Sequence, residues 1–170
     1  MKRRIIIALG MALILVATMS LPAIAAVVEQ PVTASVTVGE TMSITLTDAG
    51  TAGINFGSQA PPVTGAGDVS QNSTTPAIKV VVAPETNVQV DIGIKGVLAS
   101  GTLALTNWKY STTFGGAQLS IPATYTKIYG PVNASSESDV FHWIDVPTGT
   151  ASGSHTITVT YKVVKTGTSF

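Results

Sequence analysis

Much of this chain alternates apolar and polar side chains with a period of two. Successive side chains of an extended strand point to opposite faces, so this period predicts strands with one face against a core. The last such stretch is the clearest, because Ile157, Val159, Tyr161 and Val163 alternate there with threonine and lysine. No run with a helical period follows residue 26, so we expect the mature chain to contain no helix.

Similar alternating runs, bounded by Gly, Pro, Asn or Asp, predict the other strands. The expected strands cover residues 32–38, 42–47, 54–56, 78–82, 88–94, 103–108, 118–129, 140–146 and 156–163. Residues 57–76 are expected to form a surface connection with room for one short edge strand. About eight or nine short strands predict an all-β fold, an antiparallel Ig-like β-sandwich, with a closed barrel as the alternative. The runs at 78–82 and 88–94, joined by a Pro-containing turn, are expected to be neighbouring antiparallel strands.

The first 25 residues follow a different pattern. Three basic residues follow Met1, an uncharged apolar run extends from Ile5 to Leu21, and Ala23-Ile24-Ala25 places small residues at a cleavage position. This order predicts a helical signal peptide over residues 1–25, cleaved after Ala25, and a single domain over residues 26–170. The protein is then secreted, to the cell surface or beyond, and meets the membrane only through this segment during export. A retained anchor is the alternative, since 17 apolar residues lie at the lower limit of a span.

Composition limits the chemistry of the mature chain. Charged residues are 11% of the sequence, against about a quarter in ordinary domains. Without residues 1–25, six basic and nine acidic residues remain, a net charge of −3, which gives no basic face for nucleic acid. The chain has no cysteine, which excludes disulfides, thiolate metal sites and cysteine nucleophiles.

The two histidines and nine acidic residues form no recognisable catalytic or metal-binding motif. His142 alternates with Phe141 and Trp143, so we expect it to face solvent while the aromatic residues face the core. These observations predict a protein that is not an enzyme and has no cofactor or metal. An extracellular hydrolase would need a pair of carboxylates across a cleft, and the sequence does not indicate one.

Residues 26–31 precede the first predicted strand and include Val27, Val28 and Pro31. Proline lacks a backbone N–H, so Pro31 separates this apolar segment from the strand at 32–38. Exposed strand edges invite pairing with another chain, and an added strand from a second copy would cover them. The segment therefore predicts self-association through a donated strand. The alternative is a leader that frays or that packs against its own sheet.

Two further features indicate contact with carbohydrate. Asn72-Ser73-Thr74 and Asn133-Ala134-Ser135 are sequons in predicted surface loops, which makes Asn72 and Asn133 candidate glycosylation sites. Trp108, Tyr110 and Phe114 lie close together in the sequence and are candidate ligand aromatics, since aromatic faces stack on sugar rings. Such a platform would bind surface glycans. The alternative is that large aromatics on strands fill the core.

Three segments carry a resemblance to known surface proteins. Ile54–Ser58, with its Phe-Gly turn, and Val146–Gly153, which leads into Thr156–Tyr161, resemble segments of WxL-type cell-wall domains. The chain also resembles spore-coat-U-like proteins and archaeal thread or TasA-type filament subunits. It departs from the first group because Trp108-Lys109-Tyr110 lacks the motif's Leu, and from the second because it has no cysteine. The resemblance implies a β-sandwich outside the cell, but it identifies no functional residue.

Together these features predict a secreted structural protein of the cell surface or extracellular matrix, a filament-forming subunit that assembles by strand donation. The alternative is a carbohydrate-binding or adhesive module.

Overall fold

The computed structural model describes residues 35–48 and 53–170. The predicted signal helix and its cleavage site at Ala25 lie outside these residues. The chain divides into two units, residues 1–37 and residues 38–170, and all the described strands belong to the second. Apart from one 3₁₀ turn, η1 (Leu105–Asn107), the regular structure of the described residues is β-strand. The all-β prediction is therefore confirmed.

Nine strands make up the described fold. They are β1 (Ile44–Asp48), β2 (Val63–Gly67), β3 (Ile78–Val82), β4 (Val90–Ser100), β5 (Trp108–Ser111), β6 (Leu119–Ser120), β7 (Thr126–Val132), β8 (Glu137–Val146) and β9 (Thr156–Lys165). β2 lies within the connection at 57–76, where the sequence allows one short edge strand. Most strands end at Gly, Pro or polar turn residues, as the sequence pattern predicts.

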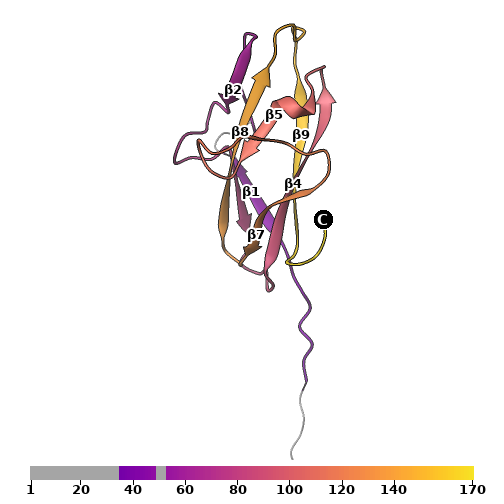
Figure 1. The fold of residues 1–170 in the computed structure, drawn as a ribbon. Helices are drawn as coiled ribbons and strands as arrows, with labels where there is room; N and C mark the ends of the chain where they lie inside the picture. The colour runs from indigo at the N-terminus through magenta and orange to yellow at the C-terminus, as the bar shows by residue number, and fades with distance from the viewer. Residues whose placement is uncertain (1–34, 49–52) are drawn as a thin grey trace, which may run out of the picture. The chain divides into compact units, whose positions relative to one another are not determined.

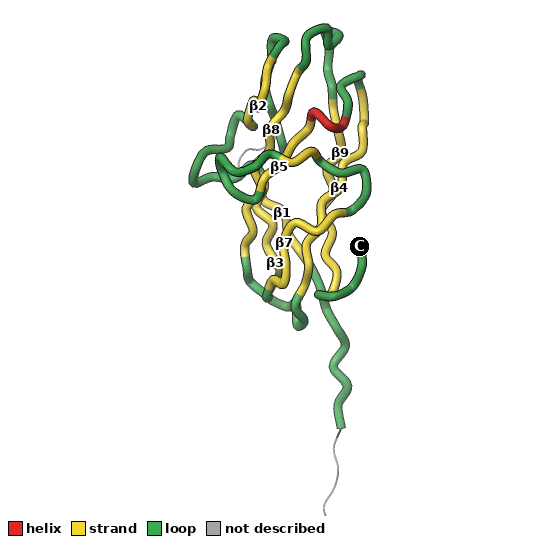
Figure 2. Tube along the Cα trace, viewed as in Figure 1, coloured by secondary structure: helices red, strands yellow, loops and turns green. Residues whose placement is uncertain are grey.

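The strands form two antiparallel sheets, so the predicted β-sandwich is confirmed (Figures 1 and 2). One sheet has the order β1-β3-β8-β5-β6, with β2 also paired to β8. The other has the order β7-β4-β9. β4 is the centre of this smaller sheet, and its long ladder with β9 runs from Val90 opposite Lys165 to Ser100 opposite Thr156.

β8 organises the larger sheet because it pairs along both of its edges. β5 lies on one edge, opposite Phe141–Ile144. On the other edge, β3 pairs with Glu137–Val140 and β2 pairs with Trp143–Val146. The gap between β2 and β3 falls at His142. There the side chain of Gln71 completes the ladder, since its Oε1 accepts from His142 N and its Nε2 donates to His142 O, both at 2.8 Å.

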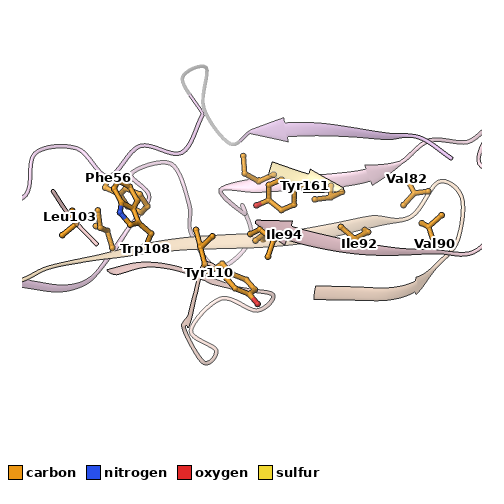
Figure 3. Packing of buried hydrophobic residues seen from close by; sticks show 14 of the residues in the cluster. Phe56, Val82, Val90, Ile92, Ile94, Leu103, Trp108, Tyr110 and Tyr161 are labelled. Atoms are coloured by element: carbon orange, nitrogen blue, oxygen red, sulfur yellow. The ribbon is translucent and has the colours of Figure 1, made fainter. Parts of the chain in front are cut away.

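The core lies between the two sheets (Figure 3). Alternate residues of β3 and β4 point into it, and Val80, Val82, Val90, Ile92 and Ile94 are completely buried. Figure 3 shows Phe56, Leu103 and Trp108 grouped at one end of this core, with Val82 and Val90 at the other. Burial of aliphatic side chains from both layers is the main force that holds the sheets together.

Four strand predictions are wrong. In the run predicted as a strand at 103–108, residues 105–107 form η1 and the strand β5 begins only at Trp108. Residues 35–38, the described part of the run at 32–38, form no strand. Residues 54–56 form no strand either, because two side chains hold this backbone in a turn. Asn55 N donates to Asp68 Oδ2 at 2.5 Å, and Gly57 N donates to Asn55 Oδ1 at 2.9 Å. β3 and β4 are not neighbours but lie in different sheets, since the connection at 83–89 crosses from one layer to the other.

Truncation of a buried β4 side chain should be costly. Ile92→Ala is expected to lower the free energy of unfolding by about 2–5 kcal/mol, because it removes apolar contacts and leaves a cavity between the sheets. Val97→Ala on the same strand is the control, since Val97 is half exposed, and its expected cost is below about 1 kcal/mol. Urea denaturation followed by tryptophan fluorescence measures both. Equal costs would contradict this assignment of the core.

Candidate functional site

A cavity formed by described residues of both sheets lies beside β9. Its volume is about 850 Å³. It is bounded by the first half of β9, the second half of β8, the turn at 53–59 and the loop at 150–155. The strand residues that line it are Leu46, Ile78, Trp108, His142, Ile144, Val146, Thr156, Ile157, Val159 and Tyr161. We call this cavity the β9 groove.

The strand residues that line the groove are mainly apolar, whereas the loop at 150–155 adds polar residues such as Thr150, Ser152 and Ser154. Ile157 and Val159 of β9 point toward it and remain only half buried, while Ile144 and Val146 of β8 are buried across from them. Phe56 is buried against Trp108, with ring centroids 5.7 Å apart in an edge-to-face arrangement. The groove thus offers a concave apolar surface to an added apolar group.

A polar contact between the sheets lies at the floor of the groove. His142 Nε2 of β8 and the Tyr161 hydroxyl of β9 are 2.8 Å apart, and the histidine is completely buried. Burial lowers the pKa of His142 to about 4, although the backbone of Lys109 acts in the opposite direction. Burial also raises the pKa of Tyr161. At neutral pH both groups are therefore uncharged, and their hydrogen bond joins the two layers.

A second tyrosine extends this polar layer. The Tyr129 hydroxyl donates to the backbone carbonyl of Asp139 and lies 3.2 Å from that of Thr112. Burial, together with the negative charge of Asp139, raises its pKa to about 12. The tyrosines of β7 and β9 thus each reach across to the larger sheet or to the loop that follows β5. Trp108 Nε1, also buried, has no hydrogen-bond partner among the described residues.

β9 has an uncovered edge beside the groove. Among the described strands it pairs with β4 alone, so every second residue of its ten points its backbone N–H and C=O away from that ladder. Ile157 and Val159 are on this strand. An apolar groove and a row of unpaired backbone groups therefore lie side by side.

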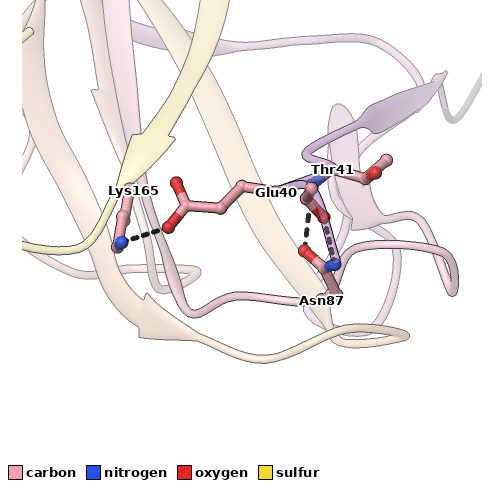
Figure 4. Close-up of polar contacts among 5 residues, drawn as sticks. Glu40, Thr41, Asn87 and Lys165 are labelled. Carbon is pink, nitrogen blue, oxygen red and sulfur yellow. Dashed lines mark hydrogen bonds and ion pairs between the residues drawn. The ribbon is translucent and has the colours of Figure 1, made fainter. Parts of the chain in front are cut away.

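The chain enters the sandwich at the far end of the same strand. Glu40 forms an ion pair with Lys165, the last residue of β9 (Figure 4). Asn87 fixes the backbone next to Glu40, because its Oδ1 accepts from Thr41 N at 2.9 Å and its Nδ2 donates to Gly39 O at 2.8 Å (Figure 4). Just before this anchor, Val36 and Val38 are 87% and 75% exposed.

The structure buries two of the three candidate ligand aromatics. Trp108 is 6% exposed and Tyr110 is 5% exposed, and both belong to the core, because their strand β5 lies between β8 and β6. Phe114 is 43% exposed and packs on Phe141 and Trp143. Of the three candidate ligand aromatics, Phe114 is therefore the one with an exposed ring, and a role in carbohydrate binding stays a prediction.

The two candidate glycosylation sites lie in exposed positions. Asn72 Oδ1 accepts hydrogen bonds from Thr74 N and Thr75 N, which closes the turn between β2 and β3. Asn133 Oδ1 accepts from Gln89 Nε2 at 3.1 Å, and this residue lies between β7 and β8. Both asparagines are solvent-exposed. Modification at either site stays a prediction.

The expected orientation of His142 is wrong. β8 is buried on both faces, since Phe141 and Trp143 are covered on one side while His142 and Ile144 face the core on the other. Alternation could not distinguish the two faces because both carry large side chains. The groove itself was also missed by sequence reasoning, since its walls come from separate strands of both sheets. The regular run at 156–163 was the one local signal.

Comparison of the chain with protein families, with curated proteins and with solved structures finds no match in any of the three. Within residues 35–48 and 53–170, no group of three or more His, Cys, Asp or Glu side chains is arranged to hold a metal ion. The same residues contain no helix long and apolar enough to cross a membrane. The features of the described residues that bear on function are the groove, the open edge of β9 and the exposed valines.

The buried histidine should make stability depend on pH. The folded pKa of His142 is about 4 and lies below the unfolded value of about 6.5, so the unfolded state binds the proton more readily. The neutral, buried His142 therefore contributes fully to the free energy of unfolding above pH 6.5. This contribution, up to about 3 kcal/mol, is lost as the pH falls toward 4. His142→Gln should flatten the decline in unfolding free energy between pH 6.5 and 4.5. Urea titrations across this range measure the slope, and an equal slope in the variant would contradict the prediction.

Proposed function

We propose that this protein is a secreted structural subunit of the cell surface or extracellular matrix that assembles by strand donation. The amino-terminal segment of one copy adds a strand to the sheet of another copy, and repetition of this contact forms a filament. The segment preceding residue 26 supports export, and the sandwich supplies a rigid body. The proposal assigns the protein no catalytic activity.

One observation carries this proposal: the alternating segment at 32–38 has its described valines in solvent and outside any strand. Val36 and Val38 are among the most exposed large apolar residues of the described chain. The sequence places Val32, Ala34, Val36 and Val38 on one face of an extended strand, with Thr33, Ser35 and Thr37 on the other. The segment thus has the sequence pattern of a half-buried strand, while its described valines, Val36 and Val38, are not buried by any sheet.

The free energy of burying its valines favours association over folding as the role of this segment. Burial of a valine side chain contributes about 1.5–3 kcal/mol at most. Several valines buried together, with backbone hydrogen bonds to a sheet edge, suffice for a stable contact between subunits. The core between the sheets forms without them, since it consists of residues from Ile44 onward.

Carbohydrate binding has less support. The hypothesis required Trp108, Tyr110 and Phe114 to share an exposed surface, and the first two are buried in the core. Phe114 alone offers a single exposed ring, and that ring packs on Phe141. We therefore propose assembly as the function and no second one.

Removal of the donated segment should abolish assembly and leave the fold intact. Mature protein that lacks residues 26–38 is expected to be monomeric, with a melting temperature within a few degrees of the full-length value, because its core residues remain. Light scattering with size exclusion, and electron microscopy, measure assembly.

A matched pair of substitutions tests the role of the valines. Val36→Asp should prevent assembly, since the carboxylate would be buried against the partner sheet. Thr37→Asp lies on the opposite face of the same segment and should assemble like the wild type. If the truncated protein instead melts much earlier while its oligomeric state is unchanged, the segment belongs to its own fold and strand donation is refuted.

A further inference from the structure

This inference rests on the proposed function and identifies the acceptor. We propose that the β9 groove is the acceptor site, and that residues 32–38 of a second copy pair antiparallel with the outer edge of β9. Their apolar face then fills the groove between the sheets. The partner is a second copy of this chain, and the contact joins opposite ends of successive subunits.

Among the described edge strands, β9 is the best suited to accept a partner. β7 is the opposite edge of the same sheet, but Pro131 removes a backbone donor and its pairing with β4 shifts register twice. β6 has two residues and β1 has five. β9 has ten residues and no proline, and its ladder stays in register from Val90 to Leu98 of β4. A long, regular edge is the usual template for strand addition.

The groove also matches the face that the segment offers. Ile157 and Val159 on β9 are half buried beside the cavity, so an added strand would complete their burial. Residues 32–38 would extend about 23 Å as a strand, and β9 about 33 Å, so the open edge is long enough. A cavity of about 850 Å³ has room for several small side chains such as valine and alanine. Thr33, Ser35 and Thr37 would face solvent, like the threonines of β9.

The two ends of β9 determine the geometry of the contact. The chain enters the sandwich beside Lys165, whereas the groove lies beside Thr156–Tyr161, toward the other end of the strand. If residues 32–38 of one copy pair antiparallel with β9 of another at the groove, the Lys165 end of the donor copy comes next to the groove end of the acceptor copy. The donor surface and the acceptor surface differ, so the contact is head-to-tail and does not close on itself as a twofold dimer does.

Substitutions in the groove test the acceptor separately from the donor. Val159→Asp places a carboxylate where the donated valines would pack and should weaken assembly at least about tenfold, seen as a higher critical concentration. Thr158→Asp, on the outward face of the same strand, is the matched control and should assemble like the wild type. If Val159→Asp assembles normally while Val36→Asp does not, strand donation stands and the β9 groove is refuted as the acceptor.

A mixing experiment shows whether the two variants fail to assemble because they are unfolded. Val36→Asp keeps an intact groove, and Val159→Asp keeps an intact donor segment. Neither should assemble alone, but a mixture should form 1:1 heterodimers that grow no further, measured by light scattering. Heterodimers would show that both variants are folded and that each lacks one half of the same contact. A mixture that stays monomeric, while circular dichroism shows both variants folded, would overturn the proposal.

Cross-linking tests the direction of the pairing. The wild-type chain has no cysteine, so two introduced ones react only with each other. One cysteine is introduced on the donor by Ser35→Cys and the other on β9 by Thr160→Cys or Thr158→Cys, all on outward faces. Oxidation of assembled protein should give a ladder of covalent multimers on a non-reducing gel. Internally linked monomers from both pairs would mean that the segment folds back on its own β9, which would overturn acceptance by a second copy.

Discussion

The hydrogen-bond ladders on both edges of β8 are the constraint on which the larger sheet depends. Three strands from separate parts of the chain meet this strand, and each occupies a different stretch of its length. Both faces of β8 are covered as well, so its residues contribute to the core and to the outer aromatic layer at once. The loop that begins at Asp68 is held on β8, since Asp68 N and Gln71 Nε2 both donate to His142 O. Because β8 is fixed on both edges, the cavity wall that His142 and Ile144 form is fixed as well.

The two layers are joined by apolar burial and by a few polar contacts of fixed direction. Hydrophobic packing tolerates sliding of one sheet over the other, since it has no preferred direction. The hydrogen bond between His142 and Tyr161 does have a preferred direction. Both groups are buried, so loss of this bond would leave each of them unsatisfied, at a cost in stability. The tyrosine of β7 makes a similar contact with the opposite layer. These contacts hold the second half of β8 and the middle of β9 at a defined separation, and the groove lies beside them.

Local pattern sufficed to predict the strands but not their partners. The run from Ile157 to Val163 was predicted as a strand because its alternation is regular and one of its faces is polar. The turn between β3 and β4 predicts that they are neighbours, yet it connects two layers, which depends on packing far from the turn. His142 was misplaced since neither face of β8 is polar. The exposed segment was recognised from its valines, whereas the groove required the arrangement of both sheets.

Gln71 shows how a loop residue can take the place of a strand. A primary amide carries the same donor and acceptor as a peptide unit, and Gln71 presents both to His142 at normal distances. Gly67 lies directly beneath it, where a Cβ atom would come within 2.7 Å of Nε2. Two short strands that never meet can thus share one edge without leaving a peptide group of β8 unsatisfied between them. The side chain of Gln71 makes this join together with the backbone N–H of Asp68, which donates to His142 O at 3.1 Å, and the chain then turns away into the loop that contains Asn72.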